Sequence, residues 1–191
     1  MLLRWCFPAA PAWPFLWLCV VATLGCASGE EFAGPLPSPD GALFVKDVYP
    51  LLLRDCAHTD CHGVQERFFQ LYGPGRARMP AAQMSEANRV ELDYTDPANI
   101  EEVLHSYERA RSMLATSQRI EDTLLLRKPL EAQAGGQGHK GVDDLGRNLY
   151  ASQQDPGWQR LRAWAMSKGS PPTAAQVKAI NDALAAGEVG K

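Results

Sequence analysis

The residues with the clearest capacity for chemistry are Cys56 and Cys61, followed directly by His62. Two nearby thiols can each add to a vinyl group of a haem, and a histidine after the second thiol is then held under the iron as its proximal ligand. The commonest spacing is C-x-x-C-H, whereas four residues separate the cysteines here. Because the second cysteine and the histidine keep their adjacency, we expect one covalently bound haem c per chain.

The same residues allow two other interpretations. A Cys56–Cys61 disulfide is feasible across a short loop in an oxidising compartment, and His62 would then have no special role. The chain would in that case be a non-haem envelope lipoprotein that acts as an interaction module. A zinc site would combine both cysteines with one or two histidines, although no second paired cluster completes it; the candidates are His58, His62, His105 and His139.

The sixth position of the iron has two candidate ligands. Met79 precedes Pro80, as in a Met-Pro ligand loop, but only sixteen residues separate it from His62. His139 lies later, in a loop whose glycines let the backbone approach a flat macrocycle closely. We therefore favour His139 as the distal ligand, with Met79 as the alternative. An iron with both axial positions filled has no place for a substrate, so we expect an electron carrier and not an enzyme.

Other polar or soft side chains have simpler roles. A cation at Arg127 or Lys128 could pair with a haem propionate, although a solvated pair of charges is the plainer interpretation. We expect His58 to face solvent and His105 to lie at the surface or at an interface. Met166 is expected in the core.

The first 25 residues resemble a secretory signal. Arg4 is the only charge before a long apolar run, which ends in small residues. Prolines at 8, 11 and 14 interrupt the run and argue against a transmembrane anchor. The sequence Leu24-Gly25-Cys26 is similar to a bacterial lipobox, in which the cysteine becomes lipidated. We therefore expect a lipid anchor at Cys26 in the cell envelope, with plain periplasmic secretion as the alternative.

Removal of this signal changes both the cysteine count and the charge. Cys6 and Cys19 would be lost, which leaves Cys56 and Cys61 as the one pair beside the lipidated residue. Loss of Arg4 leaves 18 basic against 22 acidic side chains, a net charge of −4. No basic stripe is present, so nucleic acid is excluded as the expected partner. Redox proteins of the envelope are the expected partners instead.

The mature chain divides into a tether and one domain. Residues 26–41 are rich in glycine, proline and acidic side chains, which predicts a flexible tether. Residues 42–191 show helical spacing and no convincing strand beyond a short run at 90–94, which predicts a mainly α domain with long loops. The expected helices begin near Asp40 with a bend at Pro50, at Asp96-Pro97, at Asp155-Pro156 and at Thr173, where Gln176 completes a capping box. A short helical or extended piece is expected near 120–126. Gly187 is the expected end of the last helix. Long loops need an organiser, which favours a bound cofactor.

Residues 44–52 (FVKDVYPLL), followed by the Cys56-to-Gly63 motif, resemble the opening of cytochrome c domains of the planctomycete and myxobacterial type. Residues 124–130 (LLLRKPL), 138–141 (GHKG) and 158–164 (WQRLRAW) resemble the closing half of the same domains, where Lys-Pro-Leu precedes a His-containing glycine loop and a final helix. The resemblance spans roughly residues 42–170. It implies a class I cytochrome c-like fold, with a small helical domain around one haem.

Overall fold

The computed structural model describes residues 36–64, 66–139 and 148–186. Helices and loops make up this part of the chain, and its one β feature is an isolated parallel bridge between Leu130 and Tyr150. The predicted mainly α class is therefore confirmed. The predicted signal peptide (1–25) and Cys26 lie outside the described residues. Within the described ranges, no helix is both long and apolar enough to cross a membrane.

The first helical run leads directly to the cysteine motif. It consists of α1 (Gly41–Leu43), a π-helical turn (Phe44–Val48) and α2 (Tyr49–Asp55). Asp40 caps it as predicted, since its carboxylate accepts a hydrogen bond of 2.7 Å from the backbone N–H of Leu43. Pro50 lacks an N–H group, so regular α-helical bonding cannot continue through this point. A π-helical turn precedes α2, and Pro50 lies in the first turn of α2, a position that tolerates proline.

Helix α3 (Ile100–Leu114) begins later than the sequence predicted. Its N-cap is Asn99, which forms a capping box with Glu102. The Asp96-Pro97 pair, which has the composition of a helix start, instead belongs to a turn: the Asp96 carboxylate accepts from the Asp93 N–H at 2.7 Å. The prediction was wrong because a cap-like sequence also suits a tight turn. The buried apolar face of α3 is formed by Val103, Tyr107, Ala110 and Leu114.

The remaining helices follow their predicted caps. The 120–126 region contains a 3₁₀ turn (Ile120–Asp122) and α4 (Leu124–Arg127), and α5 (Pro156–Met166) and α6 (Ala174–Ala185) follow. Asp155 caps α5, and Thr173 with Gln176 caps α6, so both predictions are confirmed. Gly187 lies outside the described residues. Met166 is 55% exposed at the end of α5, so its predicted place in the core was wrong.

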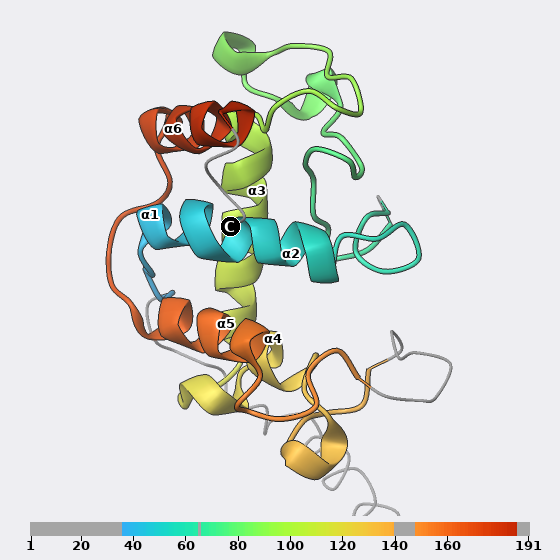
Figure 1. The fold of residues 1–191 in the computed structure, drawn as a ribbon, viewed down its shortest axis with the longest axis vertical. Coiled ribbons are helices and arrows are strands. Elements are labelled where there is room, and N and C mark those ends of the chain that lie inside the picture. The colour runs from blue at the N-terminus through green and yellow to red at the C-terminus, as the bar shows by residue number, and fades with distance from the viewer. Residues whose placement is uncertain (1–35, 65, 140–147, 187–191) are drawn as a thin grey trace, which may run out of the picture. The chain divides into compact units, whose positions relative to one another are not determined.

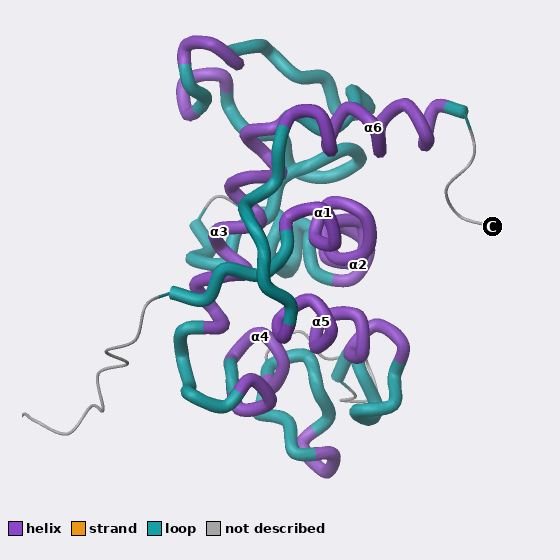
Figure 2. The backbone as a smooth tube through the Cα atoms, turned by 90° about the vertical axis from the view of Figure 1, so that its left-hand side faces the viewer, coloured by secondary structure: helices purple, strands orange, loops and turns teal. Residues whose placement is uncertain are grey.

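The core lies where α1, the π-helical turn and α2 pass between α5 and α6, with α3 crossing alongside (Figures 1 and 2). The ring of Phe44 contacts Tyr107 edge-on at 5.3 Å between ring centres and Trp164 at 5.1 Å. Trp158 is buried as well, and its indole N–H donates to the Leu126 carbonyl at 3.1 Å. Aromatic burial of this kind supplies much of the stabilisation of a small core. Both tryptophans therefore belong to the core.

The segment from 63 to 95 is mostly loop, with short 3₁₀ turns at Ala81–Gln83 and Glu86–Asn88. The expected extended run at 90–94 forms no strand. A small second cluster of Tyr72, Met79 and Met84 anchors the segment. A buried ion pair between Arg78 and Glu102, with a closest approach of 2.9 Å, ties this loop to α3.

The folded body begins before residue 42. Residues 38–41, assigned to the tether from composition, pack against later helices: the Tyr107 hydroxyl donates to the Pro39 carbonyl at 2.7 Å, and the Gly169 N–H donates to the Ser38 carbonyl at 2.9 Å. A β-carbon added at Gly41 would lie 2.4 Å from the Pro172 backbone nitrogen. These backbone bonds order a stretch too polar to order itself by apolar burial.

Candidate functional site

The cysteine motif folds into one compact loop at the end of α2. The N–H of His62 donates to the Cys56 carbonyl at 3.0 Å and closes the loop, while the N–H of Cys61 donates to the His58 carbonyl at 2.9 Å. Gly63 completes the turn, and a β-carbon there would lie 2.5 Å from the Ala57 carbonyl oxygen. The four intervening residues are therefore accommodated in a turn that keeps both cysteines and the histidine together.

Both cysteines and His62 line a cavity of about 790 Å³. This volume lies within the range of small-molecule and cofactor sites, which are mainly apolar with a few placed polar groups. Its polar lining groups are Asp55, Cys56, Cys61, His62, Arg67, Lys128 and His139. Its other lining residues are Leu52, Phe68, Phe69, Met113, Leu124, Leu125, Pro129, Gly138, Leu149 and Leu161.

His62 is held as a neutral imidazole. Its ring contacts Phe69 edge-on, with 4.8 Å between ring centres, and its Nδ1 is buried without a hydrogen-bond partner. Burial, with smaller contributions from His139 and the Arg67 charge, lowers the pKa of His62 to about 4. A neutral imidazole is the form that ligates metals, so this side chain is in its ligating state at neutral pH.

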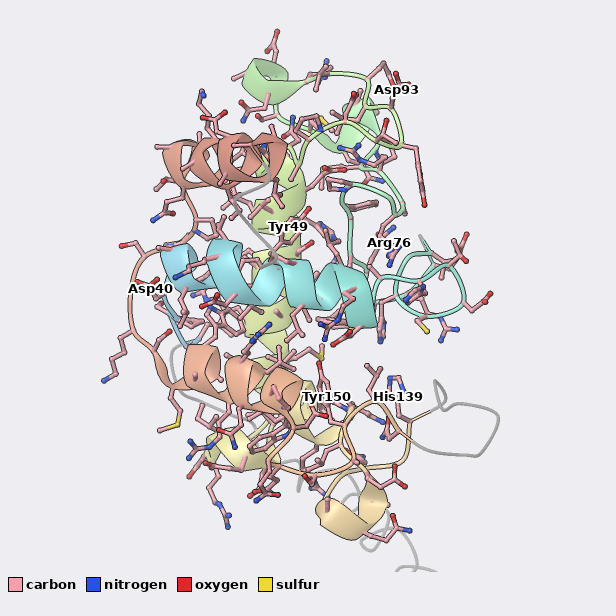
Figure 3. The ribbon with its side chains drawn as sticks, viewed as in Figure 1. Asp40, Tyr49, Arg76, Asp93, His139 and Tyr150 are labelled. Carbon is pink, nitrogen blue, oxygen red and sulfur yellow. The ribbon has the colours of Figure 1, made fainter. Side chains whose placement is uncertain are left out.

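The structure brings His139 to His62. Their ring centres are 5.9 Å apart, with 49° between the ring planes. His139 lies beyond the end of α2, on the loop that follows α4 (Figure 3). Although 76 residues separate the two histidines in the sequence, both line the same cavity.

Backbone contacts hold the His139 loop against the end of α4. The N–H of Gln137 donates to the Arg127 carbonyl at 2.8 Å, and the Lys128 Nζ donates to the Gly138 carbonyl at 3.2 Å. At Gly136 two segments of the backbone are so close that a β-carbon would lie 1.8 Å from the Leu130 carbonyl oxygen. Glycine at position 136 therefore allows two backbone segments of the protein to approach each other closely.

Met79 lies in a different part of the fold. It is 5% exposed within the second cluster, and its backbone N–H donates to Glu102 at 3.1 Å. It lines a second cavity of about 420 Å³ together with His105, and it does not line the cavity that contains His62. Between the two candidate distal ligands, the structure therefore places only His139 near His62.

Cys56 and Cys61 are free thiols in the structure. Burial, followed by the nearby Asp55 carboxylate and Cys61, raises the pKa of the Cys56 thiol to about 12.

In the ranges that the structure describes, no three His, Cys, Asp or Glu side chains form a group that could hold a metal ion. The zinc interpretation therefore finds no preformed ligand set there. His58 is exposed as expected, with its Nε2 2.8 Å from the Arg54 carbonyl oxygen.

Several lining residues were not predicted. Of the two cations considered for a haem propionate, Lys128 lines the cavity and Arg127 does not. The second cation in the cavity lining is Arg67. Asp55 was missed as well, although its position directly before Cys56 was an available signal. Arg67 carries no such signal, because its place depends on how the loop after His62 turns back.

The site has the chemical groups that a covalent haem requires. Two thiols can form thioethers, two imidazoles can ligate iron, apolar walls suit a flat macrocycle and two cations suit its carboxylates. The residues present therefore fit the group that the sequence predicts. Comparisons with protein-family models, with curated proteins and with solved structures found no match for this chain.

Proposed function

We propose that this chain is a c-type cytochrome that binds one haem covalently and carries single electrons in the cell envelope. The observation that supports the proposal most strongly is that the rings of His62 and His139 lie close together, with ring centres 5.9 Å apart, in the cavity that Cys56 and Cys61 also line. The fold around the haem would then be of the class I cytochrome c type.

The separation of the two imidazoles suits a shared metal. With ring centres 5.9 Å apart, His62 and His139 would both be near enough to hold one iron, and two imidazoles are ligands that iron accepts. Two histidines that merely packed against each other would have no need of adjacent thiols.

Each lining residue has a role in the proposal. Cys56 and Cys61 would hold the macrocycle by thioether bonds, His62 would be the proximal ligand and His139 the distal one. Lys128 and Arg67 would pair with the propionates. When bound, the haem supplies one-electron chemistry between ferric and ferrous iron. If His62 and His139 both ligated the iron, no position would be left for a substrate, so the proposed role is electron transfer and not catalysis.

The proposed location follows from the N-terminal sequence. Cleavage before Cys26 and its lipidation would hold the domain at a membrane, where redox proteins of the envelope are its proposed partners. Replacing Cys26 with Ser would release the protein into the soluble periplasmic fraction. A Cys26→Ser variant that still fractionated with membranes would contradict the lipid anchor.

The covalent haem is tested by expressing the full chain together with haem-attachment machinery. We expect a red protein that keeps its haem stain after denaturing electrophoresis, and loss of that stain in the double variant Cys56→Ser/Cys61→Ser. His58→Ala is the matched control, since this exposed histidine lies in the same loop and does not line the cavity. A colourless wild-type protein would overturn the proposal and favour the non-haem lipoprotein.

Axial ligation is tested separately. His139→Ala should convert a low-spin haem spectrum to a high-spin one, and the covalent stain should remain. Met79→Leu should leave the spectrum low-spin, since Met79 lies in the second cluster. The opposite pattern would assign the distal position to Met79.

A further inference from the structure

A carboxylate forms part of the cavity wall directly beside the first cysteine. Asp55 ends α2, lines the cavity, and its side chain is only 11% exposed. Arg54 makes two hydrogen bonds to it, at 2.5 and 2.9 Å, but the Arg54 side chain is 66% exposed. Water screens the exposed cation far more than the buried carboxylate. The net electrostatic effect on the cavity is therefore that of a negative charge.

Tyr150 holds this carboxylate from a distant part of the chain. Its hydroxyl donates to Asp55 Oδ2 at 3.0 Å, and the residue is 3% exposed. Burial above all, with Cys56 and Asp55 adding to it, raises the pKa of Tyr150 far above its ordinary value. The hydroxyl therefore keeps its proton and remains a donor. Figure 3 shows Tyr150 between α5 and the end of α2.

The position of Tyr150 is fixed by its own backbone and by its ring. Its N–H donates to the Pro129 carbonyl at 2.9 Å, and its carbonyl accepts from the Glu131 N–H at 2.9 Å. The ring packs so closely on α5 that a β-carbon at Gly157 would lie 2.6 Å from it. Because both the backbone and the ring of Tyr150 are fixed, its hydroxyl stays in place and can fix the Asp55 carboxylate.

We propose that Tyr150 is a positioning residue that fixes the Asp55 carboxylate in the cavity wall, and that this fixed negative charge lowers the reduction potential of the haem. The inference rests on the proposed function, because it requires a haem in this cavity. Reduction adds an electron to the haem. A nearby negative charge opposes that addition and stabilises the ferric form.

The test is the midpoint potential of the haem-loaded protein at one fixed pH. Asp55→Asn keeps the shape of the side chain and removes its charge, so the potential should shift upward. Asp60→Asn is the matched control: it removes the same charge from an exposed position in the neighbouring loop, outside the cavity lining, and should shift the potential much less. Equal shifts in the two variants would overturn the proposal.

The role of Tyr150 is tested with Tyr150→Phe, which removes only the hydroxyl. Its potential should shift upward by less than that of Asp55→Asn, and the double variant should shift no further than Asp55→Asn alone. An unchanged potential in Tyr150→Phe, or additive shifts in the double variant, would overturn the positioning role. Asp55→Asn tests the electrostatic part independently if Tyr150→Phe folds poorly.

Failure of this inference is distinguishable from failure of the proposed function. A wild-type protein without covalent haem contradicts the proposed function, and the inference falls with it. A wild-type protein with a low-spin haem, but with equal potentials in Asp55→Asn and the wild type, contradicts the inference alone. In the haem-free protein the hydroxyl proton of Tyr150 should exchange slowly in NMR spectra, and fast exchange there would also contradict the fixed hydrogen bond.

Discussion

In the proposed cytochrome, the substitution Gly136→Ala should detach His139 from the iron without altering His139 itself. A β-carbon at Gly136 would lie 1.8 Å from the Leu130 carbonyl oxygen, whereas real β-carbon contacts essentially never fall below 3.0 Å. Gly136 and the Leu130 carbonyl must therefore separate by about 1.2 Å or more. Metal–ligand distances hold to within about 0.2 Å, so in the proposed cytochrome a shift of this size in the loop that carries His139 would break the bond from His139 to iron.

The assay is the visible spectrum of the haem-loaded variant, and a low-spin spectrum should become high-spin. Gly138→Ala is the matched control, because a β-carbon there meets nothing within 4 Å, and its spectrum should stay low-spin. Covalent attachment should survive in both variants, since the cysteine loop is untouched. A low-spin spectrum in Gly136→Ala would refute the reasoning that this glycine positions the distal ligand.

Two further predictions concern stability. Glu102→Gln leaves the Arg78 guanidinium buried without a counter-charge, which should lower the free energy of unfolding by about 3–5 kcal/mol in urea titrations, while the haem spectrum stays the same. A loss below about 1 kcal/mol would show that the pair is not needed. Burial lowers the pKa of His62 to about 4 in the folded haem-free protein, so protonation favours the unfolded chain. The favourable contribution of neutral His62 to the free energy of unfolding should be complete above about pH 6.5 and should decline as the pH falls toward 4. The His62→Gln variant should show a smaller loss of stability over the same pH range.

Helix starts were predictable wherever the cap is local. Asp40, Asp155 and Thr173 each accept a hydrogen bond from a backbone N–H two or three residues ahead, so a short window of sequence contains both partners. The start of α3 was missed because Asp96 and Pro97 have the same composition as a cap. Arg78, far earlier in the chain, donates to the carbonyls of both residues and stabilises the turn, a contact that sequence spacing does not reveal.

The candidate site likewise combines residues that could be predicted from a short stretch of sequence with residues whose role depends on the fold. The adjacency of Cys61 and His62 is visible in the sequence, and the loop that holds them closes on itself. Asp55 and Arg67 gain their significance from the cavity, and the cavity exists only once α4 and the His139 loop pack against the end of α2. The hydrogen bond from Tyr150 to Asp55 spans 95 residues, a distance at which sequence spacing carries no information.

The two sides of the proposed haem site depend on different parts of the chain. The proximal side depends on one short loop after α2, where Gly63 and the hydrogen bond from His62 to Cys56 close the turn. The distal side depends on a chain of contacts from α4 through Gly136 to His139, each of which joins separate segments. Substitutions scattered over residues 127–139 should therefore open the distal position while the covalent bonds persist. In the proposed cytochrome, the first step away from electron transfer would then be a haem protein with an open distal position, able to bind a small ligand, rather than a haem-free one.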